Sequence, residues 1–365
     1  MNKGWQRLLL AVALIGALPL TGCTTPTGTK AGTSKPAPPL ASVTPLADPR
    51  SHEGPSTAVI KDAGIHPVTA GEPALPATVV DAQGTRVQVT DTSRVLALDI
   101  YGTLSRTVFE LGQGERLVGR DLSTQFDPAK KLPLVTPGGH DLNAEAILGL
   151  DPTLIITDTS LGPWDVILQM RDAGIPVVVT ESARNLDNID TITTQVATAL
   201  GVPQAGAELN ERISAELDEV RTQIKKVAPT AISDQLRTVF IYARGKSGVY
   251  YLFGEGSGAD SLITSLGLYD VAAEIDWKGS KPLTDEGIIA AQPDVILMMT
   301  QGLSSAGGVD GLLKRFPALA NTPAGQNRRI VDMDDSAILG YGPLTPAVLN
   351  ALAVAIYAPD AIGGN

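Results

Sequence analysis

A pattern that occurs twice restricts the fold of this chain more than any other feature. The stretches 145–156 and 286–297 each begin with a glutamate that lies seven positions before a proline. Each copy predicts a short helix, a turn at the proline and a buried strand rich in branched apolar residues. Because neither unit can bury its own apolar face, we expect two related lobes, one built around each copy.

Residues 204–227 form the longest helix that the sequence predicts. Apolar residues recur along it at Leu209, Ile213, Leu217, Val220 and Ile224. Their spacings of 4, 4, 3 and 4 place them on one helical face. A helix of roughly 24 residues spans about 36 Å, which is longer than a crossover between neighbouring strands needs. We therefore expect this helix to join the two lobes.

Short apolar runs alternate with helical patterns on both sides of this helix. Strands are expected at 78–80 and 87–89 as a hairpin, then at 95–98, 117–119, 154–157, 177–179, 239–242, 249–253, 295–299 and 329–331, and helices at 103–111 and 164–173. The alternation predicts the α/β class, as two Rossmann-like α/β lobes joined by a single long backbone helix. The predicted boundaries are 76–186 for the N-terminal lobe, 187–228 for the interlobe helical region and 229–365 for the C-terminal lobe.

The N-terminus carries the only cysteine of the chain, Cys23. It follows Lys3, Arg7, an apolar run over 8–18 and several small residues. This order is typical of a secretory signal, and its end resembles the lipobox of bacterial lipoproteins. The resemblance implies removal of residues 1–22 and attachment of diacylglycerol and palmitate-type acyl chains to Cys23, at the extracytoplasmic face of the cell membrane. An ordinary signal peptide with an incidental cysteine is the alternative.

Residues 23–75 differ in composition from the rest of the chain. They are mostly Thr, Pro, Ala, Ser and Gly and show no apolar period of two or 3.6 residues. Such a segment offers too little apolar surface to offset the entropy of an ordered chain. Prolines also bias it towards extended conformations. We therefore predict a disordered tether between the lipidated Cys23 and the folded part.

The repeat places Glu145 and Glu286 at equivalent positions, near the starts of two predicted helices. The helix dipole favours negative charge there, so helix stabilisation alone is a sufficient explanation. The layout from about residue 76 to 357 nevertheless resembles the substrate-binding proteins of bacterial ABC importers for iron-siderophores, cobalamin and haem, the class III periplasmic-binding-protein type. That resemblance implies a ligand between the lobes, and docking of both glutamates against arginines of the permease. Thr153 departs from the Asp that usually follows the proline.

One histidine, His140, lies in the predicted folded part, directly after two glycines that permit an exposed loop. In the other half, Tyr242 and Arg244 share one side of a predicted strand. These residues resemble the His loop and Tyr-x-Arg strand of haem-binding lipoproteins of the HmuT type. The resemblance implies that His140 and Tyr242 are the axial ligands of haem iron and that Arg244 supports the tyrosinate. A loop histidine, a core tyrosine and a surface arginine are the alternatives.

Further candidate pocket residues carry a weaker signal. Four of them could form apolar walls for a flat macrocycle: Trp277, Met298, Met299 and Tyr341. Lys278 and Lys281 could meet the haem propionates. Single aromatic residues and methionines are more often part of a core, so these six remain candidates.

The sequence predicts no enzyme. Gly245-Lys246-Ser247 lacks the earlier glycine of a P-loop, because Phe240 occupies that position, and Ser257 lacks the flanking pattern of a nucleophile elbow. Zinc or manganese capture would need several histidine and carboxylate ligands at one site, and the predicted folded part has a single histidine.

The expected function is that of a membrane-anchored receptor. It binds haem b as a transported ligand, takes it from surface haem-binding proteins and delivers it to an ABC permease with its ATPase. Loss of Lys3 and Arg7 would change the formal charge from −11 to −13, which disfavours nucleic acid as a partner. An iron-siderophore receptor of the same fold is the alternative.

Overall fold

The computed structural model describes residues 34–69 and 71–363. The predicted signal peptide over 1–22, Cys23 and the first part of the predicted tether over 23–33 lie outside the described residues. The chain from Ser34 onward forms one unit, so the two lobes below are parts of a single body. Within the described residues, none of the helices combines the length and the hydrophobicity that a bilayer crossing needs.

The N-terminal lobe contains the predicted hairpin and a three-stranded parallel sheet. The hairpin is β2 (Ala77–Val80) and β3 (Arg86–Val89), and the sheet has the order β4 (Val95–Leu98), β5 (Leu154–Thr157) and β6 (Val177–Val179). All residues of the parallel strands are buried, as expected for a sheet that is covered on both faces. The helices of the lobe are α1 (Thr103–Glu110), α2 (Ala144–Leu148) and α3 (Trp164–Asp172).

The strand expected at 117–119 is wrong. Leu117 makes only an isolated bridge to Val95, directly after the short helix η3 (Gly114–Arg116). The apolar side chains there follow a tight turn, and pairing with the sheet stops at this single bridge, where the N–H of Val118 donates to the carbonyl of Val95 at 3.0 Å. A three-residue apolar run cannot distinguish such a bridge from a strand.

The C-terminal lobe is built on a seven-stranded sheet. Its order is β1-β12-β11-β7-β8-β10, with β9 beside β7. The strands are β1 (Ser56–Ala58), β7 (Arg237–Arg244), β8 (Val249–Phe253), β9 (Tyr269–Asp270), β10 (Ser280–Pro282), β11 (Val295–Met299) and β12 (Ile330–Met333). The helices are α6 (Ala259–Ser265), α7 (Val271–Glu274), α8 (Asp285–Ala291), α9 (Thr300–Ser305), α10 (Gly308–Arg315), α11 (Pro317–Ala320), α12 (Pro323–Gln326) and α13 (Thr345–Tyr357). Strands β1, β12, β11 and β7 are parallel, so the predicted α/β class is confirmed.

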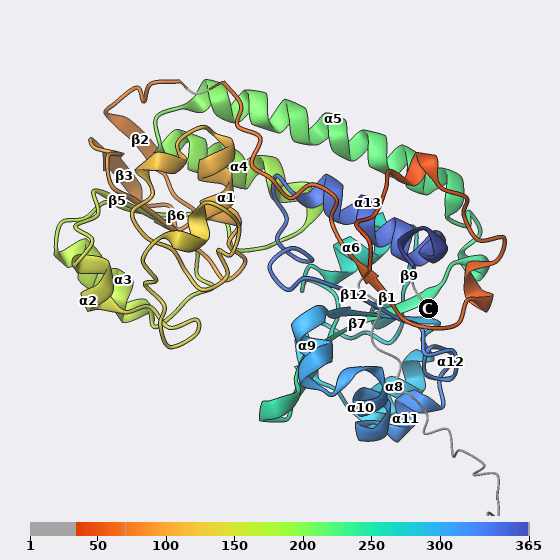
Figure 1. Ribbon diagram of the computed structural model, residues 1–365. Helices are drawn as coiled ribbons and strands as arrows, with labels where there is room; N and C mark the ends of the chain where they lie inside the picture. The colour runs from red at the N-terminus through yellow and green to blue at the C-terminus, as the bar shows by residue number, and fades with distance from the viewer. Residues whose placement is uncertain (1–33, 70, 364–365) are drawn as a thin grey trace, which may run out of the picture. The chain divides into compact units, whose positions relative to one another are not determined.

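A helical pair lies between the two sheets in sequence, as α4 (Ile189–Ala199) and α5 (Pro203–Val227). Helix α5 confirms the long helix that the apolar spacing predicts, and all five residues of the predicted face are buried. Pro203 begins it, because a first-turn proline loses no helical hydrogen bond. Figure 1 shows α5 running from the part that holds β4–β6 to the part that holds β7.

The segment before the hairpin corrects the predicted tether. Disorder is wrong for the described residues of the range 23–75, because they pack on both lobes. Strand β1 pairs in parallel with β12, the backbone N–H of Leu46 donates to the carbonyl of Tyr357 at 2.7 Å, and Leu40 and Val68 are buried. Backbone hydrogen bonds to elements far along the chain provide the order that local composition does not reveal. Helix α5 is therefore accompanied by a second crossing between the lobes.

Candidate ligand-binding site

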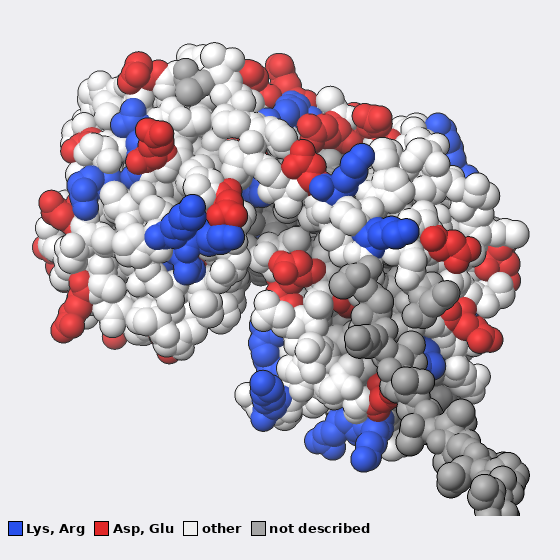
Figure 2. Space-filling model, viewed as in Figure 1, with Lys and Arg blue, Asp and Glu red and all other residues white. Residues whose placement is uncertain are grey.

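A cavity of about 1010 Å³ lies between the two lobes. Figure 2 shows the surface hollowed at this place. The N-terminal lobe contributes residues around Tyr101, Ser123 and His140, and the C-terminal lobe contributes the ends of β7, β11 and β12 with the loop that follows β12. Small-molecule pockets commonly measure roughly 300–1,000 Å³, so the cavity is large enough for a sizeable organic ligand.

His140 reaches the cavity from a loop of the N-terminal lobe. Gly139 before it has φ 105°, a backbone conformation that residues with a Cβ rarely adopt, and its N–H donates to the carbonyl of Thr136 at 3.2 Å. The imidazole is accessible from the cavity, yet the walls partly desolvate it. This desolvation, followed by the positive charge of Arg244, lowers the pKa of His140. The ring is therefore mostly neutral near pH 7, the form that binds a metal ion.

Tyr242 and Arg244 lie near the carboxyl end of β7 and both line the cavity, as their alternation along the strand predicts. The Arg244 Cζ lies 4.7 Å from the centre of the Tyr242 ring. Phe253 of β8 stacks on the Tyr242 ring, with 5.7 Å between the two ring centres. Asp335 holds the guanidinium through an Nη1–Oδ2 contact of 3.3 Å. Arg244 is thereby held over the face of the tyrosine ring.

The structure therefore brings His140, Tyr242 and Arg244 together. The first comes from one lobe and the other two from the opposite lobe, and all three line one cavity.

Two of the six further pocket candidates line the cavity, namely Met299 and Tyr341. The Tyr341 hydroxyl donates to the carbonyl of Gly258, and burial raises its pKa. Its backbone has φ 41°, which is uncommon for a residue with a side chain. The loop after β12 therefore holds this ring firmly against the cavity wall.

The other four candidates are wrong as cavity residues. Met298 is completely buried, because side chains alternate along β11 and its neighbour Met299 takes the cavity side. Trp277 donates from Nε1 to the carbonyl of Leu252 at 2.9 Å, and Lys281 lies 5.5 Å from its ring centre. Lys278 forms surface ion pairs with acidic neighbours at 3.5 and 3.6 Å. None of the four is among the residues that line the cavity.

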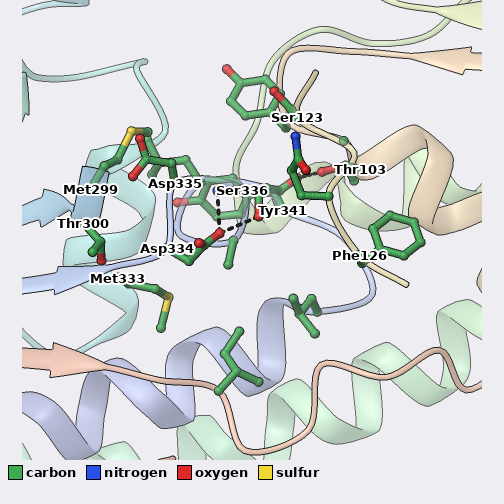
Figure 3. Close-up of a pocket in the computed structure, with 18 of the residues that line it drawn as sticks. Thr103, Ser123, Phe126, Met299, Thr300, Met333, Asp334, Asp335, Ser336 and Tyr341 are labelled. Carbon is green, nitrogen blue, oxygen red and sulfur yellow. Dashed lines mark hydrogen bonds between the residues drawn. The ribbon is translucent and has the colours of Figure 1, made fainter. Parts of the chain in front are cut away.

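Several cavity residues escaped the sequence analysis. They are Tyr101, Thr103, Arg106, Ser123, Phe126, Thr300, Met333 and the loop Asp334–Ser336. Figure 3 shows Phe126 and Thr103 on the opposite side of the cavity from Met299 and Met333. Tyr101 follows β4, and Met299 and Met333 end β11 and β12. Ligands of open α/β sheets bind outside the carboxyl ends of the strands. The residues that directly follow each predicted strand could therefore have been identified as candidate cavity residues from the sequence.

A buried charge network supports the wall behind Tyr101. Arg184 contacts Oδ2 of Asp99 at 3.2 Å and Oδ2 of Asp158 at 2.6 Å, and its Cζ lies 5.1 Å from the Tyr101 ring centre. Asp121 accepts a hydrogen bond from the N–H of Asp99 at 3.2 Å. Burial and the charge of Asp99 raise the pKa of Asp121 to about 7 and that of Asp158 to about 6. Asp99 and Asp158 share one guanidinium, and Asp121 lies beside Asp99 without an ion pair to Arg184, so the network retains protons.

Comparison with known proteins agrees with this arrangement. A family model described as periplasmic binding protein matches residues 100–337. The chain belongs to this family. The crystal structure of the haem-binding protein HmuT superposes with a TM-score of 0.80 at 40% identity and covers 86% of this chain and 100% of its own. Solved HmuT variants include alanine replacements of one histidine, one tyrosine and one arginine, the last two being two positions apart.

Two further relatives are less similar to this chain. The periplasmic haem-binding protein RhuT from Roseiflexus sp. RS-1, in its apo form, superposes with a TM-score of 0.66 at 39% identity and covers 74% of this chain and 99% of its own. YvrC, an ABC transporter substrate-binding lipoprotein of Bacillus subtilis (strain 168), is 22% identical over 287 residues, which cover 78% of this chain and 86% of YvrC. These relatives are named as binding and transport proteins.

The protonated network predicts a pH dependence of stability. The folded-state pKa values of Asp121 and Asp158, about 7 and about 6, lie above the value of 3.8 for an unperturbed aspartate. Between about pH 4 and 7 the native protein thus holds protons that the unfolded chain releases, so stability falls as the pH rises through this window. We expect Asp121→Asn to flatten the fall, by at most about 1.4 kcal/mol per pH unit for one proton. Urea unfolding from pH 5 to 8 measures both slopes, and equal slopes would contradict the assignment.

Proposed function

We propose that this protein is an extracytoplasmic haem receptor, which binds haem b between its lobes and delivers it to an ABC permease for uptake. One observation carries the proposal: His140 from one lobe and Tyr242 from the other line the same cavity. An imidazole nitrogen and a tyrosinate oxygen are suitable axial ligands for ferric haem iron. Relatives that bear this pair of lobes are named as haem-binding proteins.

The surroundings of the two residues suit such a ligand. The lowered pKa of His140 keeps the imidazole neutral and able to donate its lone pair. The guanidinium of Arg244 lies over the face of the Tyr242 ring and places a positive charge beside this proposed ligand. Phe126, Met299 and Met333 offer apolar and polarisable surface to a flat macrocycle. Haem would thus be held by one axial bond from each lobe.

Addition of haemin to the purified protein tests this proposal. We expect a sharp Soret band, with a shift and broadening in His140→Ala and Tyr242→Ala and at least tenfold weaker binding of haemin in each, because each loses an axial ligand. His52→Ala is the matched control, since His52 is a histidine outside the cavity and should leave the spectrum unchanged. Absence of a Soret band in the unmodified protein would favour an iron-siderophore ligand instead.

We further propose that Glu145 and Glu286 dock the receptor on arginines of the permease. Both side chains are exposed, in the first turns of α2 and α8. Asn143 and Thr284 already cap these helices, by accepting hydrogen bonds at 2.8 and 3.1 Å, so the glutamates are not needed as caps. Neither carboxylate forms an ion pair with any described residue. Both are therefore free for a partner.

The two glutamates also have matching apolar neighbours. Leu148 and Ile289 lie three positions after Glu145 and Glu286, and 47% and 58% of their surfaces are exposed. Residues three positions apart share a helix face. Each lobe therefore presents one carboxylate beside one aliphatic side chain, and a partner that engages both lobes would meet the same combination twice.

The double variant Glu145→Lys with Glu286→Lys should abolish uptake of haem iron in cells that depend on this receptor. Haemin binding by the purified variant should be unchanged, because neither residue lines the cavity. Asp165→Lys with Asp310→Lys provides the control, since it makes the same charge change at exposed first-turn positions of α3 and α10. Normal uptake by the glutamate variant would refute docking through these residues.

The lipid anchor at Cys23 belongs to the same proposal. An acyl chain there would keep the receptor at the extracytoplasmic face of the membrane, beside its permease and within reach of surface haem-binding proteins that act as donors. Metabolic labelling with a palmitate analogue should mark the wild-type protein and leave Cys23→Ala unlabelled. Equal labelling of the two proteins would exclude the anchor.

A further inference from the structure

Residues 59–68, which we name the interlobe strap, cross from the C-terminal to the N-terminal lobe. The strap continues directly from β1, whose three residues pair with Val331–Met333 of β12. The hydroxyl of Thr57 donates to Oδ1 of Asp332 at 2.9 Å, and the carbonyl of Val59 accepts from the N–H of Ala37 at 2.8 Å. The start of the strap is thus fixed to the C-terminal lobe.

The other end of the strap is fastened to the N-terminal lobe by an arginine of α1. Arg106 donates through Nη1 to the carbonyl of Ala63 at 2.9 Å and through Nη2 to the carbonyl of Gly64. Its side chain is only 8% exposed. Burial of a guanidinium is costly unless acceptors surround it, so these two strap carbonyls help to stabilise Arg106 in its buried position.

Glu110, one turn along α1, holds the strap a few residues further on. Its Oε2 accepts from the N–H of His66 at 3.1 Å, and its carbonyl accepts from the N–H of Val68 at 2.8 Å. Arg212 of α5 contacts the same Oε2 at 2.9 Å and donates to the carbonyl of His66. One buried carboxylate thus links both arginines with the strap, and the strap joins α1 to α5.

The strap also forms part of the cavity. Val59, Ile60 and Ala63 of the strap line the same space as His140 and Tyr242. Thr57 and Ala58 of β1 continue this wall. In Figure 1 the orange trace of this segment passes between the two lobes, next to α13 and α5. The lobes are therefore connected twice, by α5 and by the strap, and a ligand between them has the strap as one wall.

We infer that the interlobe strap is an element of the ligand site that retains the bound ligand by tying the lobes together, with Arg106 and Arg212 as the residues that fasten it. A second connection restricts how far the lobes separate, so the ligand leaves slowly while the strap is fastened. The identity of the ligand rests on the proposed haem function, whereas the fastening of the strap does not.

Arg106→Met and Arg212→Met in the full chain test this inference. Hydrogen exchange of a peptide covering residues 61–69 should become roughly tenfold faster in both, because strap carbonyls lose the guanidinium donors that fasten them and the strap opens more often. Transfer of haemin to excess apomyoglobin should accelerate by a similar factor, and the Soret spectrum of Arg212→Met should be unchanged because Arg212 lies outside the cavity. Arg171→Met is the matched control, since Arg171 pairs with Asp81 at 3.6 Å, away from strap and cavity.

The two variants separate the strap from direct ligand contact. Arg106 lines the cavity and Arg212 does not, so faster haemin release in both supports retention by the strap. Faster release in Arg106→Met alone would overturn the inference in favour of direct contact, as would unchanged exchange of residues 61–69. Failure of the unmodified protein to bind haemin would reject the haem proposal, and the exchange measurement would still decide whether the arginines fasten the strap.

Discussion

Parallel strand pairing is the constraint on which the site depends. In both lobes the pairing brings the carboxyl ends of neighbouring strands to one edge, and the residues that follow these ends face the cavity. Tyr101 follows β4, whereas Met299 and Met333 end β11 and β12. A register shift of one residue would turn the side chains of Met299 and Met333 to the opposite face of the sheet. The backbone ladders thus set the composition of the cavity wall before any ligand is present.

Buried charges stabilise the framework of both lobes. In the N-terminal lobe, Arg184 neutralises part of the charge of Asp99 and Asp158. In the C-terminal lobe, Arg329 donates instead to the carbonyls of Ala355 and Ile356, near the end of α13 where the helix dipole favours a cation. Burial lowers the pKa of Arg329 to about 10. These charges stabilise the protein framework, while Arg244 remains accessible at the cavity.

The sequence predicts those helices and strands whose apolar residues recur with a regular spacing along the chain. Helix α5 buries the face that the apolar spacing defines, and β8 and β11 have the predicted bounds. The position of His140 follows from glycines beside it, and that of Tyr242 from alternation along a strand. By contrast, Met298 and Trp277 could not be separated from true cavity residues, because burial against a core and burial against a ligand select the same side chains.

The sequence by itself therefore determined the α/β class, the two related lobes, the long helix and the residues proposed to bind iron. Each of these depends on a local period or on a motif. Only the tertiary structure decided that residues 34–69 pack on both lobes, that Arg106 and Glu110 hold the strap, and that Asp99 and Asp158 share Arg184. These features depend on hydrogen bonds and ion pairs between residues far apart in the chain, and no periodicity records which distant groups will meet.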